Sequence, residues 1–171
     1  MPVHDPYITI HAASRTEPAP SAYDLAKRPG FLIRRLHQIH VALFIEECAS
    51  FEVTPVQYSV MTAAQANPGL DQARLGEEIG VDRATLANVV GRLDRRGLLQ
   101  RHTSPADRRL RLVELTEAGA RLLAEMEAPA RRAHARTIAA LPPAEREMFV
   151  QALAQLVQDG NARGRAPLRL G

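Results

Sequence analysis

The sequence lacks a second cysteine, a long apolar run and a secretory signal. Its 171 residues include one cysteine, Cys48, which excludes an internal disulfide and fits a reducing cytoplasm. No run of about 18 apolar residues occurs, so we expect no transmembrane helix. The first residues include an acidic side chain and no long apolar segment, which argues against a signal peptide. We therefore expect a cytoplasmic protein.

Sequence signatures of catalysis and cofactor binding are missing as well. The chain contains no G-x-S-x-G, no glycine-rich phosphate loop and no H-E-x-x-H. We therefore expect no enzyme activity, no cofactor and no metal site. A small helical enzyme that uses Cys48 or a histidine is the alternative from another functional class.

Basic charge is concentrated in one part of the chain. Residues 83–111 contain eight arginines and two acidic residues, a net charge of +6, whereas the whole chain carries +3. A local basic block on a near-neutral protein is typical of a surface that contacts a polyanion. The alternative is a solvated arginine-rich surface. Charge alone does not decide between a polyanion-binding surface and a solvated one. The position of the arginines in the fold has to decide.

The N-terminal third predicts an arm and two helices. Residues 1–20 are rich in Ala, Pro and Ser without sustained periodicity, so we expect a flexible arm. Residues 31–51 carry apolar side chains at helical spacing, which predicts a long first helix. Thr54 followed by Pro55 is a typical helix start, and it predicts a second helix that ends near Asn67.

The middle of the chain predicts a helix-turn-helix. Asp71 can cap a short helix over 72–79, and Asp82 can cap another over 83–96. Gly80 ends the first of them and provides a tight turn. Two helices joined in this way form a helix-turn-helix.

A β-hairpin with arginines at its bend is predicted directly after the second of these helices. Its strands cover 98–103 and 110–115, and a polar turn with Pro105 joins them. In this position a hairpin forms a wing beside the exposed face of the helix. The helix can enter a major groove about 12 Å wide while the wing reaches the neighbouring narrow groove.

Two further helices complete the chain. Thr116 can cap a long helix from 117 to about 140, which Pro129 should kink or interrupt. A last helix begins near Leu141, and the final residues read as a loose tail. Its apolar stripe comprises Phe149, Leu153 and Leu156.

The segment 75–119, LGEEIGVDRATLANVVGRLDRRGLLQRHTSPADRRLRLVELTEAG, resembles the multiple-antibiotic-resistance regulator (MarR) family of transcription factors. The resemblance implies a mainly α fold with a small β-hairpin wing, that is, a winged helix-turn-helix with a helical dimerisation domain. It also implies a homodimer that binds a pseudo-palindromic operator in double-stranded DNA, and we expect a repressor that a small organic ligand releases from the operator. The implied organisation is a MarR-like domain over 21–171, with the winged helix-turn-helix at about 54–116 and dimerisation helices at about 31–51 and 117–159.

The resemblance also assigns residues to DNA. Asp107 and Arg109 match the family's Asp-x-Arg pair in the wing, where the carboxylate orients the guanidinium and the arginine enters the minor groove. Arg108 is additional to that pair and is expected to hold a phosphate. Outward positions on the recognition helix are Arg83, Ala84, Thr85, Ala87, Asn88 and Arg92. Asn88 can pair with adenine, whereas many relatives have a basic residue there.

The segment GFLIRRLHQIHVALFIEE is similar to a subgroup of these regulators that controls aromatic-acid degradation. This similarity implies a small aromatic acid or an aryl-coenzyme A thioester as effector, with Arg34, His37 and His40 as ligand-binding candidates. The two histidines could equally be packed or solvated, and no further ligand completes a metal site. Cys48 reads as a small buried hydrophobe, and the alternative is a thiol-redox sensor on the same fold.

Overall fold

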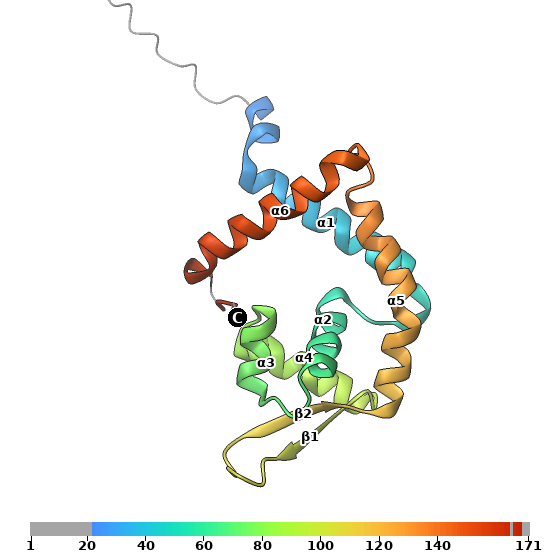
Figure 1. Cartoon of the computed structure of the whole chain (residues 1–171), viewed down its shortest axis with the longest axis vertical. Coiled ribbons are helices and arrows are strands. Elements are labelled where there is room, and N and C mark those ends of the chain that lie inside the picture. The colour runs from blue at the N-terminus through green and yellow to red at the C-terminus, as the bar shows by residue number, and fades with distance from the viewer. Residues whose placement is uncertain (1–21, 165, 169–171) are drawn as a thin grey trace, which may run out of the picture. The chain divides into compact units, whose positions relative to one another are not determined.

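The computed structural model of the protein describes residues 22–164 and 166–168 (Figure 1). The arm expected over residues 1–20 lies outside this part. Contacts divide the chain into two units that meet between Arg35 and Leu36, within helix α1.

The first unit contains a short 3-10 helix and the beginning of α1. The 3-10 helix η1 spans Ala22–Lys27, and α1 spans Pro29–Glu47. Within this unit the guanidinium carbon of Arg34 lies 5.3 Å from the centroid of the Phe31 ring. This distance is typical of a cation–π contact.

The second unit contains the predicted helix-turn-helix, with the expected caps. Helix α2 (Pro55–Ala66) begins with a capping box between Thr54 and Gln57. Asp71 and Asp82 accept hydrogen bonds from the first backbone amides of α3 (Gln72–Ile79) and α4 (Arg83–Arg95). Gly80 adopts the left-handed conformation, with φ of 65°, that closes α3 and turns the chain into α4.

The wing is a two-stranded antiparallel hairpin of β1 (Leu99–Thr103) and β2 (Arg111–Leu115). Leu99 pairs with Leu115, so the register places the turn at 104–110. The Val113 amide also donates to the Leu70 carbonyl, and this bond holds the hairpin at the start of α3. Figure 1 shows the hairpin extending beyond the helices of the helix-turn-helix.

Two long helices follow the wing: α5 (Glu117–Thr137) and α6 (Pro143–Gly160). Pro129 lies inside α5, and the helix continues through it. The residues around it, Met126, Ala130 and Ala133, are buried, and this packing offsets the hydrogen bond that proline cannot make. The described part of the tail is not loose: the 3-10 helix η3 (Asn161–Arg163) follows α6, and the chain folds back after it.

Helix α1 ends four residues earlier than the sequence predicts. A 3-10 turn, η2 (Ala49–Phe51), follows it, and Glu52 takes a positive φ of 52°. This left-handed residue turns the chain toward α2, so a single helix over 31–51 was wrong at its C-terminal end.

Two buried clusters hold the second unit together. The larger joins the helix-turn-helix to the hairpin and α5, with Met61, Leu75, Leu86, Leu93 and Val113 at its centre. The smaller joins the end of α1 to α5 and comprises Phe44, Cys48, Val53, Met126, Ala130 and Ala133. The recognition helix thus packs on a continuous core, while a second core fixes α1 against α5. None of the helices in the described part of the chain is long and apolar enough to span a membrane.

Candidate nucleic-acid interface and ligand cavity

Helix α4 has one buried face and one exposed face, as its sequence predicts. The buried face consists of Leu86, Val89, Val90 and Leu93. All six side chains expected to face outward are exposed: Arg83, Ala84, Thr85, Ala87, Asn88 and Arg92. The helix therefore presents basic, polar and small side chains on its exposed face, away from the core.

The N-terminus of α4 is fixed by the side chain of Asp82. One carboxylate oxygen accepts from the backbone amides of Ala84 and Thr85 at 3.1 and 3.0 Å. The other accepts from the Thr85 hydroxyl at 2.7 Å. The hydrogen bonds from Thr85 are the largest cause of a lowered Asp82 pKa, so the cap stays ionised at neutral pH. Because the Thr85 hydroxyl already donates to this cap, only its oxygen lone pair and its methyl group face outward.

The turn of the wing is ordered by two side chains. The hydroxyl of Ser104, which is buried, accepts from the backbone amides of Ala106 and Asp107, both at 3.3 Å. Asp107 then accepts from the backbone amide of Arg109 at 2.9 Å. The resemblance implies that this carboxylate orients the guanidinium of Arg109. In this structure it holds the backbone instead.

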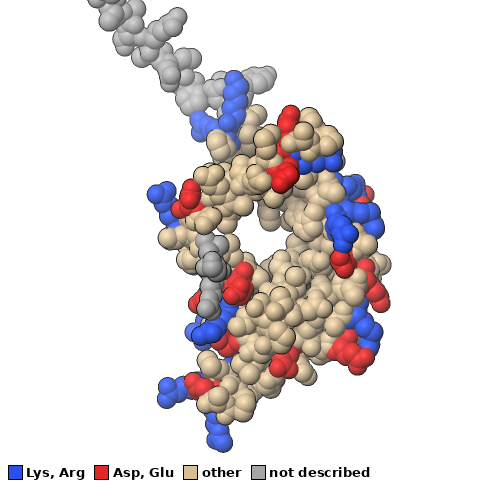
Figure 2. All heavy atoms as spheres, in the orientation of Figure 1, with Lys and Arg blue, Asp and Glu red and all other residues tan. Residues whose placement is uncertain are grey.

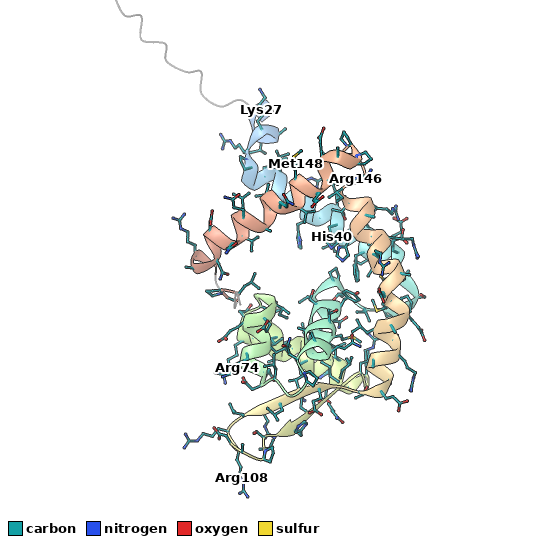
Figure 3. All side chains as sticks on the ribbon, viewed as in Figure 1. Lys27, His40, Arg74, Arg108, Arg146 and Met148 are labelled. Atoms are coloured by element: carbon teal, nitrogen blue, oxygen red, sulfur yellow. The ribbon has the colours of Figure 1, made fainter. Side chains whose placement is uncertain are left out.

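Arginine side chains point outward at the tip of the wing. Arg108 and Arg109 are exposed, and Figure 3 shows Arg108 pointing away from the hairpin. Figure 2 shows basic side chains projecting from this end of the molecule, as they also do along α5. Within the described residues, the guanidinium groups of Arg83, Arg92, Arg108 and Arg109 make no hydrogen bond or ion pair. These four arginines therefore retain their full capacity to bind an anion.

Other arginines of the basic block bind partners within the protein. Arg96 donates to the carbonyl oxygens of Phe51 and Glu52 at 2.9 and 2.7 Å, and so joins the end of α4 to the turn after α1. Arg101 pairs with Asp94 at 2.6 Å. A basic residue at the end of a helix often binds the carbonyls of its own last turn, but the observed partners of Arg96 are backbone carbonyls outside α4.

A cavity of about 350 Å³ lies between the end of α1 and the helices α2, α3 and α5. Most of its wall surface is apolar, and polar side chains from α1, α2, α3 and α5 also line it. The aromatic side chains of Phe44 and Tyr58 lie in its wall with ring centroids 5.5 Å apart. Glu78 and Ile79 contribute the end of α3 to the wall.

Two histidines stack in the wall of this cavity. The rings of His40 and His134 are 5.0 Å apart between centroids and inclined by 17°. The Thr137 hydroxyl donates to the Ala133 carbonyl and lies 2.9 Å from Nδ1 of His40. Because this hydroxyl donates elsewhere, it accepts from His40, so Nδ1 carries the proton and Nε2 is the available acceptor.

Electrostatics keep His40 neutral. Burial lowers the pKa of His40, and the neighbouring His134 and His37 lower it further. His37 does not line the cavity, although the resemblance suggested it as a ligand contact. Arg34 belongs to the first unit, where it contacts Phe31. His134 was missed, because only the fold brings a residue of α5 to α1.

Ion pairs join the outer sides of α1 and α5. Glu47 accepts from Arg132 and Arg136, each at 2.7 Å. The hydrogen bonds from these two arginines lower the pKa of Glu47. Arg131 pairs with Glu127 on its own helix. Both members of the Arg131–Arg132 pair thus have carboxylate partners within the protein.

Cys48 is buried in the smaller core, with 1% of its surface exposed. Burial is the largest cause of a raised Cys48 pKa, so the reactive thiolate is disfavoured. This environment supports the interpretation of Cys48 as a small hydrophobe. In the part of the chain that the structure describes, no three His, Cys, Asp or Glu side chains gather where they could hold a metal ion.

An outward-facing second helix of a helix-turn-helix, followed by a hairpin with arginines at its tip, defines a winged helix-turn-helix DNA-binding protein. The sequence profile of the MarR family matches residues 51–110. The transcriptional repressor NicR of Pseudomonas putida is 34% identical over 141 residues, which cover 82% of this chain and 89% of NicR. The chain belongs to the MarR family and is a DNA-binding transcriptional regulator.

Solved structures agree with this assignment. The regulator PcaV of Streptomyces coelicolor, in complex with its natural ligand, is 38% identical with a TM-score of 0.72; the match covers 81% of this chain and 98% of PcaV. BpsR of Bordetella bronchiseptica, whose DNA binding is regulated by 6-hydroxynicotinic acid, is 33% identical with a TM-score of 0.74; the match covers 81% of this chain and 97% of BpsR. The predicted family and fold class are thereby confirmed.

Proposed function

We propose that this regulator is a repressor that binds a pseudo-palindromic operator as a cytoplasmic homodimer and leaves it when a small aromatic acid binds. The observation that carries the DNA-binding half is the exposed face of α4 beside an ordered wing, whose turn carries Arg108 and Arg109 without a side-chain partner among the described residues. It works by binding, and no catalytic step is required.

The proposed DNA contacts divide into two kinds. Arg83, Arg92 and Arg108 bind phosphates, which gives affinity without reading sequence. Asn88 reads a base edge in the major groove, and Arg109 enters the minor groove. Ala84, Thr85 and Ala87 supply close contacts along the same face, and Asp107 positions Arg109 through the backbone of the turn.

The homodimer is supported by apolar side chains that one chain leaves exposed. Helix α6 buries none of its residues, and Met148 and Leu156 are 61% and 64% exposed. On α1, within the second unit, Ile39 and Ile45 are also about half exposed. Exposed apolar surface on this scale usually marks an interface. A two-fold dimer would cover it and present two recognition helices to successive major grooves.

The effector half of the proposal rests on the cavity and its histidine pair. Nε2 of a neutral His40 can accept a hydrogen bond, and a protonated His40 can pair with a carboxylate. The rings of Phe44 and Tyr58 suit an aromatic ligand. The named ligand of BpsR, 6-hydroxynicotinic acid, is an aromatic carboxylate. A cavity of about 350 Å³ matches a free aromatic acid, whereas a coenzyme A thioester would have to extend outside it. Arg34 and His37 remain proposed ligand contacts on the strength of the resemblance alone.

Release requires that the effector bind one state of the protein more tightly than another. An effector in the cavity touches α1, α2, α3 and α5 together, so it can shift the DNA-binding helices relative to α5. To release DNA it must favour the DNA-incompetent arrangement. Linkage then requires that DNA lower the affinity for the effector by the same factor.

The test is a mobility shift with the DNA upstream of the protein's own gene. We expect a shift that a scrambled duplex does not give and that hydroxybenzoates or nicotinic acid derivatives reverse. Cyclohexanecarboxylate, which has the same charge but no aromatic ring, should reverse it poorly. Thioesters tested beside their free acids separate the two effector classes. Absence of a sequence-specific shift would disprove the regulatory proposal, and a shift that no acid or thioester reverses would disprove the effector half.

A further inference from the structure

The chain after α6 forms a small closed loop. The Asn161 side chain donates to the Leu168 carbonyl and accepts from the Leu168 amide, both at 2.7 Å. The Gly164 amide donates to the Asn161 carbonyl at 3.0 Å. An asparagine paired with both backbone groups of one residue fixes the path of the segment. We call the described residues of this segment, 161–164 and 166–168, the C-terminal loop.

This loop lies on the turn between α3 and α4. A Cβ atom placed on Gly80 would lie 3.1 Å from Cδ2 of Leu168 and 3.5 Å from the Ala166 carbonyl oxygen. Gly80 has φ of 65°, so this position favours glycine for its backbone conformation as well as for the close approach of Leu168. In Figure 1 the last described residues reach α3.

Cavities on two sides of the contact confirm where the loop lies. Leu168 shares one with Ile79, Gly80 and the last turns of α6. Pro167 shares another with residues at the start of α4, among them Asp82 and Arg83. We call α2, α3, α4 and the hairpin the DNA-binding lobe. The loop therefore joins the end of α6, which lies outside this lobe, to the N-terminus of α4, the recognition helix.

The same turn also borders the proposed effector cavity. Ile79, the last residue of α3, lines both that cavity and the one beneath Leu168. One side chain thus lies between the effector site and the loop, and the next three residues lead into the cap of α4. An occupant of either cavity would therefore contact the same residue, Ile79.

We propose that the C-terminal loop is an intramolecular strap whose docking on the α3–α4 turn holds the DNA-binding lobe to α6 and raises operator affinity. This inference rests on the proposed function of the chain as an operator-binding regulator. An undocked lobe samples more positions, and DNA binding must restrain them at an entropic cost. The effector and the strap then act on the same residue, Ile79, from neighbouring cavities.

The test uses two substitutions that undo the strap in different ways. Leu168→Ala removes the side chain over Gly80, and Asn161→Ala opens the loop without changing the contact face. Ala162→Ser, at an exposed position in the same short helix, is the matched control. None of the three alters charge, so an effect on DNA binding cannot come from lost phosphate contacts.

Hydrogen exchange of the amides of residues 79–82 is measured first, because it reports docking whether or not the chain binds the chosen DNA. We expect faster exchange there in both variants, and wild-type exchange in the control. Operator affinity should fall by about tenfold in each variant, and by little more in the double variant because both remove one contact. Unchanged exchange overturns the docking. Faster exchange with wild-type affinity for an operator that the wild type binds overturns the regulatory role. Absence of any operator binding by the wild type counts against the proposed function instead.

Discussion

Arg109 stands at the wing tip with an exposed guanidinium and a backbone held by Asp107. Replacing it by alanine should weaken operator binding by about 1–3 kcal/mol, because a positioned minor-groove arginine is lost. Arg131→Ala removes the same charge from α5, where the side chain pairs with Glu127, and should have little effect. Fluorescence anisotropy with a labelled operator measures both. Operator affinity equal to that of the wild type would show that the wing does not read the groove through Arg109.

Substitutions of Asp107 distinguish two roles of its carboxylate: holding the backbone of the turn, or orienting the Arg109 guanidinium by charge. In this structure its oxygen accepts from the Arg109 amide, a role that the side-chain oxygen of asparagine can also fill. Asp107→Asn should therefore keep near-wild-type operator affinity, whereas Asp107→Ala should lower it by about 1 kcal/mol as the turn loosens. The same anisotropy assay distinguishes them. If the asparagine variant loses as much affinity as the alanine variant, the carboxylate acts through its charge on the guanidinium.

His40 makes stability depend on pH in a defined direction. Its pKa is lowered by burial and by His134 and His37, so between that value and about 6.5 the unfolded chain binds a proton that the folded chain does not. Above about pH 6.5, His40 therefore costs no folding free energy. As the pH drops from there through the lowered pKa, the free energy of unfolding falls. Tyr58 and Glu78, from α2 and α3, face the same cavity. Thermal melts from pH 7.5 to 5 should show the decline, and His40→Gln should flatten it.

Binding of an anionic effector should shift the pKa of His40 in the opposite direction. A carboxylate beside His40 favours the protonated ring, so binding near pH 6 should take up protons. Calorimetry in two buffers of different ionisation enthalpy measures the uptake, and a buffer-independent enthalpy would place the carboxylate away from the histidine pair.

At the scale of the element, α4 contains a glycine that its fold does not need. A Cβ on Gly91 would meet only Nη1 of Arg95, at 3.7 Å, which is ordinary contact. Gly91→Ala should therefore raise the free energy of unfolding by about 1 kcal/mol, the difference in helix propensity. Gly119→Ala, in the first turn of α5, is the opposite case, because its Cβ would lie 2.1 Å from the Leu98 carbonyl oxygen. Urea unfolding should show stabilisation by the first and destabilisation by the second, and a loss of stability in both would contradict the open space seen at Gly91.

The elements with local signals could be predicted from the sequence. Asp71 and Asp82 cap α3 and α4 where expected, because an aspartate before an apolar-periodic run satisfies the orphan amides of the first turn. The exposed face of α4 could be predicted from spacing alone, because its buried residues recur every three or four positions. These features depend on residues within one or two turns of each other.

Features that depend on contacts between distant segments were missed. The stacking of His40 on His134 joins residues 94 positions apart, and neither neighbourhood in sequence indicates it. Arg96 binds the carbonyls of Phe51 and Glu52, at a left-handed turn that lies far earlier in the chain and that its own neighbourhood in sequence does not indicate. The tail was expected to be loose, yet in its described part the side chain of Asn161 binds both backbone groups of Leu168. In each case the partner is supplied by the fold.

At the scale of the whole molecule, the exposed side chains of α6 decide the oligomeric state. Met148 and Val150 are 61% and 50% exposed, and Figure 3 shows Met148 on the ribbon of α6. Because burying such side chains drives association, Met148→Lys with Val150→Lys should yield a monomer, as should deletion of residues 144–171. Gln158→Lys, at an exposed polar position on the opposite side of the same helix, is the control and should remain dimeric.

Sedimentation velocity measures the state of each variant, and operator affinity should fall with the dimer. A dimer engages two half-sites about 34–36 Å apart, and a monomer retains only one of them. The point variants keep the C-terminal loop in place, so their loss of affinity reports dimerisation, whereas the deletion removes both. If the double lysine variant is monomeric yet binds the full operator as tightly as the wild type, one lobe suffices and the two-half-site arrangement is wrong. If it stays dimeric, the interface does not depend on Met148 and Val150.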